Sequence, residues 1–539
     1  MVSNASVTIV NVGSNLQRTT KTSDNGAYRF PALPIGHYNV KVEAAGFKTE
    51  TERDLILDVA QEAVVSFTMQ AGGIEQQVVV TAEAARVDTT TSSLGHIVDN
   101  HQIAELPLNG RNFVDLTLLQ TGVTQFQGNQ PGVNGLFGEF YSSNGAPLRS
   151  NMYTLDGAIM GNIQAASASS ISGLSLGLDG ISEYKVMTNS FSAEYGLVMG
   201  SQTTIVTKSG TNQFHGDIFE YLRNSALNAR NYFDVLYSLP TTVPGGGRRT
   251  APFQRNQFGG SLGGPIRKNK TFFFGTYEGF REVSGNPPNV GVTPTIPAAC
   301  HTPVIGGVQT VTNSCDSALK PGQTENVTPS IQPILALWPL PNVQPGNQFT
   351  YLSTARTHED YAQGRIDHTI SSSDSVFGRY TYDNTNETYP KVFPLFDFGL
   401  IERQQYLTLA ENHIFSPELL NSGRFSYSRS HVLDDTPSPS NPSTSSVTGP
   451  QYSCITGRTI CPFNISSIAN FSGSTATAIN NTQDIFSFGD DLFWTKGKHG
   501  IKFGTLINHY NQYANLGVGQ KGTVAFASLQ SFLTGVYRN

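Results

Sequence analysis

The second half of the chain contains stretches in which side-chain character alternates with a period of two residues. In "YAQGRIDHTI" (361–370), polar or charged residues share one side of an extended strand, namely Gln363, Arg365, Asp367 and Thr369. Small or aliphatic residues share the other side, with His368 as the exception, namely Ala362, Gly364, Ile366 and Ile370. Successive side chains of a β-strand point to opposite faces. The pattern therefore predicts strands with one polar face and one apolar face.

The same alternation recurs in two later stretches. "DSVFGRYTYD" (374–383) sets Val376, Gly378, Tyr380 and Tyr382 opposite Ser375, Arg379, Thr381 and Asp383. "SGRFSYSRS" (422–430) sets Phe425 and Tyr427 opposite Arg424, Ser426 and Ser428. A soluble sandwich also alternates, but it should place larger aliphatic residues inside, whereas tyrosine and glycine dominate here. In a barrel wall one face meets lipid, where an Arg or Lys at mid-bilayer costs about 2–4 kcal/mol.

We therefore expect a mainly β protein in which residues 212–539 form the N-terminal portion of a transmembrane antiparallel β-barrel. Roughly ten strands of the alternating kind are expected there. They are joined as hairpins, with long loops over 283–357 and 432–481. The turn Lys208–Asn212 would end the preceding domain, and the aromatic residues after it would belong to the first wall strand.

Composition excludes several other classes of protein. The net charge of −6 gives no support for nucleic-acid binding, which favours a basic patch or stripe. No run of about 18 apolar residues occurs, so no membrane-spanning helix is expected. The N-terminus shows no basic region followed by an apolar core, and hence no signal peptide. Either the protein is cytoplasmic or the sequence begins after its true start, and the barrel pattern favours the second interpretation.

Residues 1–71 alternate strongly and contain turn signals at regular spacing, which predicts a small β-sandwich with its front truncated. The stretch "TSDNGAYRFPALPIGHYNVKVEAAGFKT" (22–49) resembles the carboxypeptidase regulatory-like, prealbumin-like sandwich. The matching positions are Asp24, Gly26, Tyr28, Phe30, Leu33, Gly36, Tyr38, Gly46 and Phe47. The resemblance places this module among carbohydrate-binding-like folds, so a carbohydrate ligand rests on that analogy alone.

Residues 72–98 begin with a glycine pair and contain the short apolar run Val78–Thr81. One interpretation is a linker whose extended stretch adds as a strand to the sheet edge of a partner. The other is that the run forms the last strand of the sandwich, or only a linker.

Residues 99–211 have mixed α/β character, with a helix-like run from Phe113 to Leu119. Two Asp-Gly turns, at Asp156-Gly157 and Asp179-Gly180, each follow a predicted strand. The block resembles the plug domain of TonB-dependent outer-membrane receptors of the Oar-like subgroup. The resemblance rests on "LPLNGRNF" (106–113), "YTLDG" (153–157), "ISEYKVMTNSFSAEYG" (181–196) and "VTKSGTN" (206–212), and it continues in "QRNQFGGSLGGPIRKNKTFFFGTYEGFR" (254–281). The plug-motif residues are Asn109, Gly110, Arg111, Asn112, Asp156, Gly157, Lys208 and Gly210.

This resemblance implies a receptor in the outer membrane of a Gram-negative-type bacterium, with the sandwich in the periplasm and a plug gating energy-coupled uptake. The implied partners are the TonB–ExbB–ExbD complex, outer-membrane lipid and an extracellular ligand that is a glycan, a peptide or a siderophore. The candidate TonB-contact residues are Val78, Val79, Val80, Thr81 and Ala82. Because receptors of this class close with about 22 strands, the sequence is expected to be a fragment. An alternative is an Oar-like surface or adhesion protein that uses the sandwich as its interaction module.

No catalytic constellation, cofactor or metal site is predicted. "GLSLG" (173–177) fits the nucleophile-elbow pattern G-x-S-x-G but lacks the strand before it and the helix after it. "GGSLGG" (259–264) indicates a glycine-kinked strand, and "HED" (358–360) indicates a solvated strand start. Cys300 and Cys315, and likewise Cys454 and Cys461, form two close pairs without zinc-type spacing. They are either disulfides or four unrelated free thiols.

Overall fold

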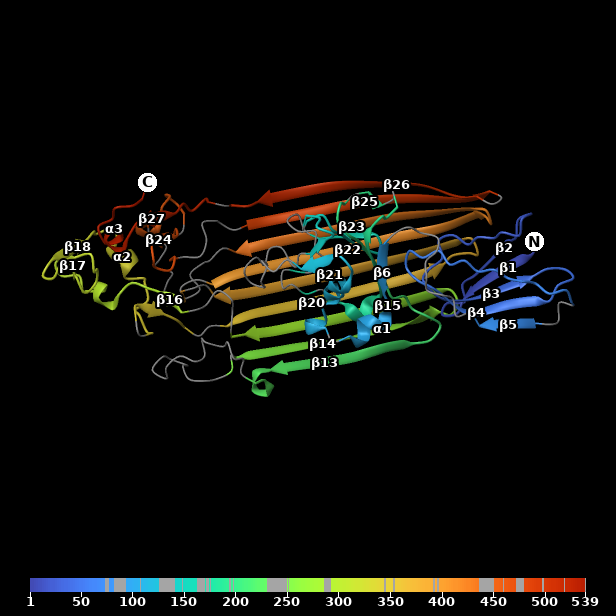
Figure 1. Cartoon of the computed structure of the whole chain (residues 1–539), viewed down its shortest axis with the longest axis horizontal. Coiled ribbons are helices and arrows are strands. Elements are labelled where there is room, and N and C mark those ends of the chain that lie inside the picture. Colours follow the sequence, from blue (N-terminus) through green and yellow to red (C-terminus); the bar gives the residue numbers. More distant parts are fainter. Residues whose placement is uncertain are drawn as a thin grey trace.

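The computed structural model divides the chain into four parts, of which the plug lies against the wall sheet in the middle of the long axis, with the sandwich at one end and the cap at the other (Figure 1). We call them the sandwich (1–81), the plug (94–210), the wall sheet and the cap. The structure describes all residues except 73–76, 82–93, 107, 126–140, 148, 162–169, 171–173, 175, 193–194, 197, 230–249, 251, 286–291, 344–345, 352–353, 391–392, 395–396, 436–449, 459, 472–478, 497–498, 518 and 539. None of the helices in this described part has the length and hydropathy needed to cross a membrane.

The sandwich contains one five-stranded sheet in the order β2-β1-β3-β4-β5. Its strands are β1 (Ser6–Asn11), β2 (Gln17–Lys21), β3 (Gly36–Glu43), β4 (Thr49–Leu57) and β5 (Gln77–Thr81). Tyr28, Phe30 and Phe67 pack from outside these strands against a core that includes Val7 and Val40. The pairings are antiparallel except that of β5, which runs parallel to β4. The Val78–Thr81 run therefore lies at an edge of this sheet.

The plug is built on a five-stranded sheet in the order β10-β9-β12-β11-β6. These strands are β6 (Leu94–Val98), β9 (Met152–Leu155), β10 (Ala158–Met160), β11 (Ile181–Asn189) and β12 (Gln202–Thr207), and a small hairpin joins β7 (Val123–Gln125) to β8 (Tyr141–Ser143). The helical elements are α1 (Asn100–Glu105) and the 3-10 turns η1 (Asn109–Arg111), η2 (Phe113–Leu119) and η3 (Leu178–Gly180). The helix-like run is thus a 3-10 helix. Asp179-Gly180 belongs to η3 and leads into β11, so the prediction that a strand enters this turn was wrong.

The wall sheet has nine strands among the described residues, where roughly ten were expected. Each strand pairs antiparallel with the next along the chain. The strands are β13 (His215–Asn224), β14 (Phe253–Arg267), β15 (Thr271–Ser284), β20 (Ala355–Thr369), β21 (Asp374–Pro390), β22 (Asp397–Ser416), β23 (Leu419–Asp435), β25 (Ile479–Lys496) and β26 (His499–Asn515). The 3-10 turn η5 (Ser225–Leu227) follows β13. "GGSLGG" lies inside β14, as predicted.

The two faces of the wall sheet differ as the alternation predicts. Gln363, Arg379 and Thr381 are buried on the face toward the plug, whereas Ile366 is 53% exposed and Tyr380 45% exposed on the other face. Outward-facing positions of the sheet therefore carry apolar and aromatic side chains, although Tyr361 and Tyr406 are buried on the face toward the plug. The interpretation of "HED" as a solvated strand start was wrong, because Glu359 lies inside β20 and is fully buried. Alternation along β20 turns this carboxylate inward, on the same side as Gln363.

The cap is a compact unit made from the two segments predicted as long loops, 283–357 and 432–481, together with residues near the end of the chain (524–533). It contains β16 (Thr293–Pro294), η7 (Ala298–Cys300), β17 (Gln309–Thr312), β18 (Thr324–Val327), α2 (Gln332–Leu335), β19 (Gln348–Phe349), η9 (Pro450–Tyr452), β24 (Phe463–Ile465), β27 (Val524–Phe526) and α3 (Leu529–Leu533). Trp338 contacts the rings of Phe393, Phe471 and Phe532 in one shared core. Disulfides join Cys300 to Cys315 and Cys454 to Cys461. The cap lies at the end of the wall sheet opposite to the sandwich (Figure 1).

If the outward face of the wall sheet lies in lipid, a charge placed on it should cost stability in proportion to its depth in the bilayer. Replacing Ile366 by Arg in the full-length protein should lower the free energy of unfolding from lipid vesicles more than the same change outside the strand, by up to about 2–4 kcal/mol. Ile370→Arg is the matched control, because Ile370 is similarly exposed but lies beyond the end of β20, so its cost should be about 0–1 kcal/mol. Equal small costs at both positions would contradict a lipid-facing surface.

The plug–wall interface as candidate functional site

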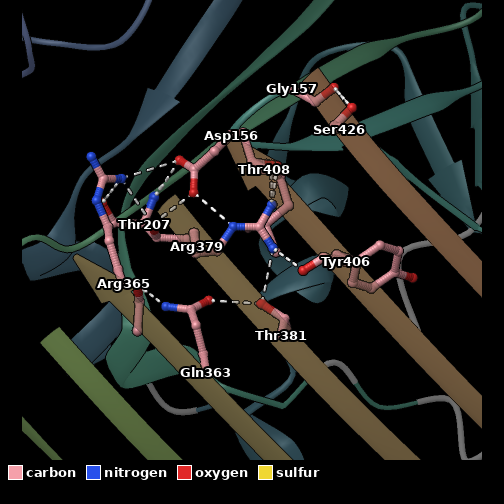
Figure 2. A network of polar contacts seen from close by, with 12 residues as sticks. Asp156, Gly157, Thr207, Gln363, Arg365, Arg379, Thr381, Tyr406, Thr408 and Ser426 are labelled. Atoms are coloured by element: carbon pink, nitrogen blue, oxygen red, sulfur yellow. Dashed lines mark hydrogen bonds and ion pairs between the residues drawn. The ribbon is translucent and has the colours of Figure 1, made fainter. Parts of the chain in front are cut away.

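Asp156 is the centre of a polar network between the plug and the wall sheet (Figure 2). It occupies the tight turn between β9 and β10 with a left-handed φ of 46°, and Gly157 follows with a φ of 85°. The turn aims the Asp156 carboxylate back at β12, where it accepts hydrogen bonds from the Thr207 amide at 3.1 Å and the Thr207 hydroxyl at 2.7 Å. On its other side the carboxylate meets two wall arginines, Arg379 at 3.1 Å and Arg365 at 3.6 Å.

Arg379 on β21 has a side chain with no exposed surface, yet all of its donors are used. Its Nε donates to Asp156, and its two terminal nitrogens donate to Thr381, the Tyr406 carbonyl, the Leu155 carbonyl and Thr408 at 2.6–3.1 Å. A guanidinium carries five N–H donors, so these five bonds satisfy it completely. Such saturation is what makes a buried charge tolerable.

Arg365 on β20 is the second wall arginine that contacts the plug near Asp156. Its guanidinium donates to the Asp367 carboxylate at 2.8–3.2 Å and to the Thr207 hydroxyl at 3.0 Å. Asp367 thus fixes the arginine in place on the wall, and Thr207 joins it to the plug. Nearby, Ser426 of β23 donates to the Gly157 carbonyl at 3.5 Å. We call this set of contacts around Asp156 the lower latch.

A second network, the upper latch, forms around Arg111 in η1. Arg111 donates to Asp179 at 2.7 Å, lies 3.6 Å from the wall residue Glu278, and stacks 3.9 Å from the centre of the Phe219 ring. Glu278 also accepts from the Gly177 amide at 2.9 Å. Burial alone would lower the pKa of Arg111, but the carboxylates of Glu278 and Asp179 outweigh it and raise that pKa. Burial raises the pKa of Asp179 despite Arg111 beside it.

The neighbouring motif residues Asn109 and Gly110 bind the wall through strand β14. Arg255 donates to the Asn109 side-chain oxygen at 2.9 Å, and Gln257 donates to the Gly110 carbonyl at 2.9 Å. Gln257 also donates to Glu278 at 2.6 Å, which joins these contacts to Arg111. Asn112 differs from the other motif residues, because its amide donates to Asp115 within the plug at 3.0 Å.

Lys208 and Gly210 lie where the chain leaves the plug and approaches the wall. The Lys208 amide donates to the Gly180 carbonyl at 2.8 Å, and burial lowers the pKa of its ammonium group. Gly210 passes so close to the wall that a Cβ there would overlap the backbone oxygens of Phe273 and Gly264. A glycine is required at this position by close backbone approach.

The plug-motif residues singled out from the sequence thus divide into three groups. Asp156 and Gly157 meet in the lower latch, and Asn109, Gly110 and Arg111 meet in the upper latch. Lys208 and Gly210 mark the junction, and Asn112 supports the plug internally. The sequence had placed Arg365 and Arg379 on the polar face of their strands but had not paired them with Asp156. Their partner could not be found from local pattern, because it lies more than 200 residues away.

The other predicted site residues lie apart from the latches. Val78–Thr81 pair with residues 50–53 of β4, and Ala82 lies outside the described residues. The four cysteines lie in the cap. Asp374, Glu411 and His413 bring possible metal-ligand atoms within 4.8 Å of one another. Hydrogen bonds from Ser371 and His413 to Asp374 already account for this group, and we assign no metal to it.

Comparison with known families gives two matches. The family described as "Outer membrane beta barrel domain" matches residues 206–539, and "Carboxypeptidase regulatory-like domain" matches residues 1–70. Among curated proteins, the chain is 25% identical over 280 residues to the TonB-dependent transporter Oar of Myxococcus xanthus. That match covers 50% of this chain and 24% of the relative, so the chain spans about a quarter of the relative's length.

Solved structures of outer-membrane proteins are also similar. The outer membrane transporter YddB from Escherichia coli matches with 14% identity and a TM-score of 0.49, covering 78% of this chain and 48% of that chain. The siderophore receptor PirA from Acinetobacter baumannii matches with 11% identity and a TM-score of 0.45, covering 80% and 50% respectively.

The lower latch predicts a large cost for removing one charge of the buried pair. Asp156→Ala and Arg379→Ala should each lower the free energy of unfolding by about 3–5 kcal/mol, because each leaves its partner buried and uncompensated. The double variant should cost much less than the sum. Lys41→Ala is the control, since its pair with Glu43 has side chains 44% and 38% exposed and should contribute about 0–1 kcal/mol. Additive costs in the double variant would contradict a direct pair.

The junction predicts a steric effect at one glycine. Gly210→Ala should destabilise the closed plug by about 1–3 kcal/mol, because its Cβ would overlap backbone atoms that cannot rotate away. Protease cleavage of the purified full-length protein would report this as faster digestion of the plug. Gly364→Ala is the matched control, because no atom lies within 4 Å of a Cβ at that wall position. Equal protection of the two variants would show that the junction has room for a methyl group.

Proposed function

Because this chain belongs to the family of outer membrane beta barrel domains, we propose that it is the gated part of a TonB-dependent outer-membrane receptor. In this proposal the plug closes the passage beside the inner face of the wall, and energy from the inner membrane moves it. The solute is large or scarce, of the glycan, peptide or siderophore class. The sandwich faces the periplasm and the cap faces outside.

The observation that carries the proposal is the set of polar bonds across the plug–wall interface, which stand beside apolar contacts of Leu176 with Phe280 and Tyr361. The Asp156–Arg379 pair, the Arg365–Thr207 bond and the Arg255–Asn109 bond all join the plug to the wall through hydrogen-bonding groups. Each of these bonds has a guanidinium donor and can be replaced by a bond to water when the surfaces separate, so its net contribution is about 1.5–3 kcal/mol. An apolar interface would instead lose roughly 25 cal/mol for each Å² exposed. A plug that must be released and bound again repeatedly is therefore better held by polar bonds than by apolar contacts.

Energy coupling is proposed to act through β5. This strand lies at the edge of the sandwich sheet, so an extended strand of TonB can add to its free side by backbone hydrogen bonds. Residues 82–93 connect β5 to β6, which is itself the edge strand of the plug sheet. Tension on β5 would therefore reach the plug at the strand that is easiest to detach. ExbB and ExbD are the proposed partners of TonB in supplying that tension.

A surface or adhesion role is the second candidate. The cap favours it, because two disulfides and a shared aromatic core give the outer end of the protein a defined surface. Adhesion needs that surface to be displayed but needs no plug movement. The two functions therefore differ in their dependence on β5.

A proline in β5 separates the two functions. Val79→Pro removes a backbone donor from this strand, so energy-coupled uptake should fall at least about tenfold, toward the level of cells without TonB. The measurement is growth of a deletion strain, complemented with the full-length variant, on whichever solute requires the gene. Val79→Thr is the control, because it keeps the donor and the β-branched shape. Unchanged uptake in Val79→Pro would contradict coupling through β5, and lost uptake with intact surface attachment would separate the two roles.

A further inference from the structure

The sandwich is attached to the plug by the loop that follows β4. The Lys185 ammonium group donates to the Ala60 carbonyl at 2.9 Å, and the Val59 amide donates to the Glu183 carboxylate. Glu183 and Lys185 both lie on β11, and only 7% and 6% of their surfaces are exposed. Val59 is 5% exposed. Two charged side chains of the plug are thus buried against one short loop of the sandwich.

The sandwich also contacts the wall sheet near the junction. The Asn212 amide donates to the Gly13 carbonyl at 3.0 Å, and Asn15 donates to Asn269 in the turn between β14 and β15 at 3.0 Å. Asn269 and Asn212 in turn bond each other twice, at 2.8 Å. The sandwich therefore spans the plug and the wall, and the plug cannot move far while it stays attached to both.

Strand β11, which the sandwich loop contacts, is the neighbour of β6, the edge strand of the plug sheet. Strand β6 pairs only with β11 among the described strands, with Val98 opposite Tyr184 and Ile97 opposite Lys185. The sandwich loop thus holds β11 at the positions where β6 is bonded to it. If the sandwich detached, β6 would lose this support. Strand β6 is also the first strand that tension on residues 82–93 would reach.

The buried contact includes two carboxyl groups. Asp58 of the sandwich loop is the carboxyl group next to Glu183. Burial and the neighbouring Asp58 raise the pKa of Glu183 to about 7. The charged groups around Glu183 are Asp58 from the sandwich, Asp99 from the residue before α1, and Lys185 on its own strand. A pKa raised by docking means that protonation favours the docked state and that docking weakens as the pH rises toward and through 7.

We propose that the sandwich is a clamp on the plug, bound through Glu183 and Lys185 of β11. This goes beyond the proposed uptake function, because it assigns the sandwich a role in keeping the plug closed. A neutral to alkaline periplasm would release the clamp more readily than an acidic one.

Cysteine labelling of the purified full-length protein in detergent tests the clamp without any transport assay, so its outcome is independent of the uptake experiment. The probe is a maleimide, and the reporter is Val59→Cys, which is covered only while the sandwich is docked. Val64→Cys is the matched control in the same module, because Val64 is 69% exposed. The native cysteines do not compete, since all four are in disulfides. Dividing one rate by the other at each pH removes the effect of pH on thiol reactivity.

At pH 6 the Val59→Cys rate should be at least about tenfold below that of the control. The ratio of the two rates should rise about tenfold between pH 6 and pH 8, as expected for a carboxyl whose pKa moves from 4.5 to about 7 on docking. Adding Glu183→Gln should remove this pH dependence and leave the site protected, whereas adding Lys185→Ala should raise the ratio already at pH 6. Equal labelling of the two cysteines at both pH values would overturn the clamp. A pH dependence of the ratio that persists with Glu183→Gln would overturn the role of the Glu183 carboxyl in docking.

Discussion

The constraint on which the structure depends is that a backbone in lipid must satisfy its hydrogen bonds internally while its charges face the other way. The inner strands of the wall sheet, β14 to β25, meet both conditions over lengths of 14 to 20 residues. Its ladders pair each strand with the next in sequence, and its alternation turns Arg379 and Gln363 inward while Ile366 and Tyr380 face outward. The polar face that lipid cannot accept becomes the surface on which the plug is bound.

That division of faces also determines how the plug is held. The inner wall offers guanidinium, amide and hydroxyl groups, so the plug presents Asp156, Asn109 and the carbonyl of Gly110 to them. The resulting interface is specific in geometry, yet its bonds can be exchanged for bonds to water. The sandwich attaches to the same assembly from the end opposite the cap, through Lys185 and Asn269. The plug therefore contacts both the wall sheet and the sandwich.

Local pattern predicted the parts of this structure that depend on local physics. Alternation identified the wall and the inward direction of Arg365 and Arg379, and the turn at Asp156-Gly157 was found from its residue types. Contacts between distant segments were beyond its reach. The cap core joins Trp338 to Phe471 and Phe532, from segments that look like loops because none of them has a buried face of its own. Likewise, nothing within Val78–Thr81 shows that the strand pairs with β4, or that Glu183 meets the sandwich.

The central claim is that the wall sheet has one face in lipid and the other against the plug. Nitroxide labels placed one at a time along residues 376–383 of β21, in the full-length protein in vesicles, test it most directly through their collisions with oxygen and with a water-soluble nickel chelate. The account predicts high oxygen access at Tyr380 and Tyr382 and low access to both reagents at Arg379 and Thr381, alternating with a period of two. Uniform access to the nickel chelate along the strand would contradict it.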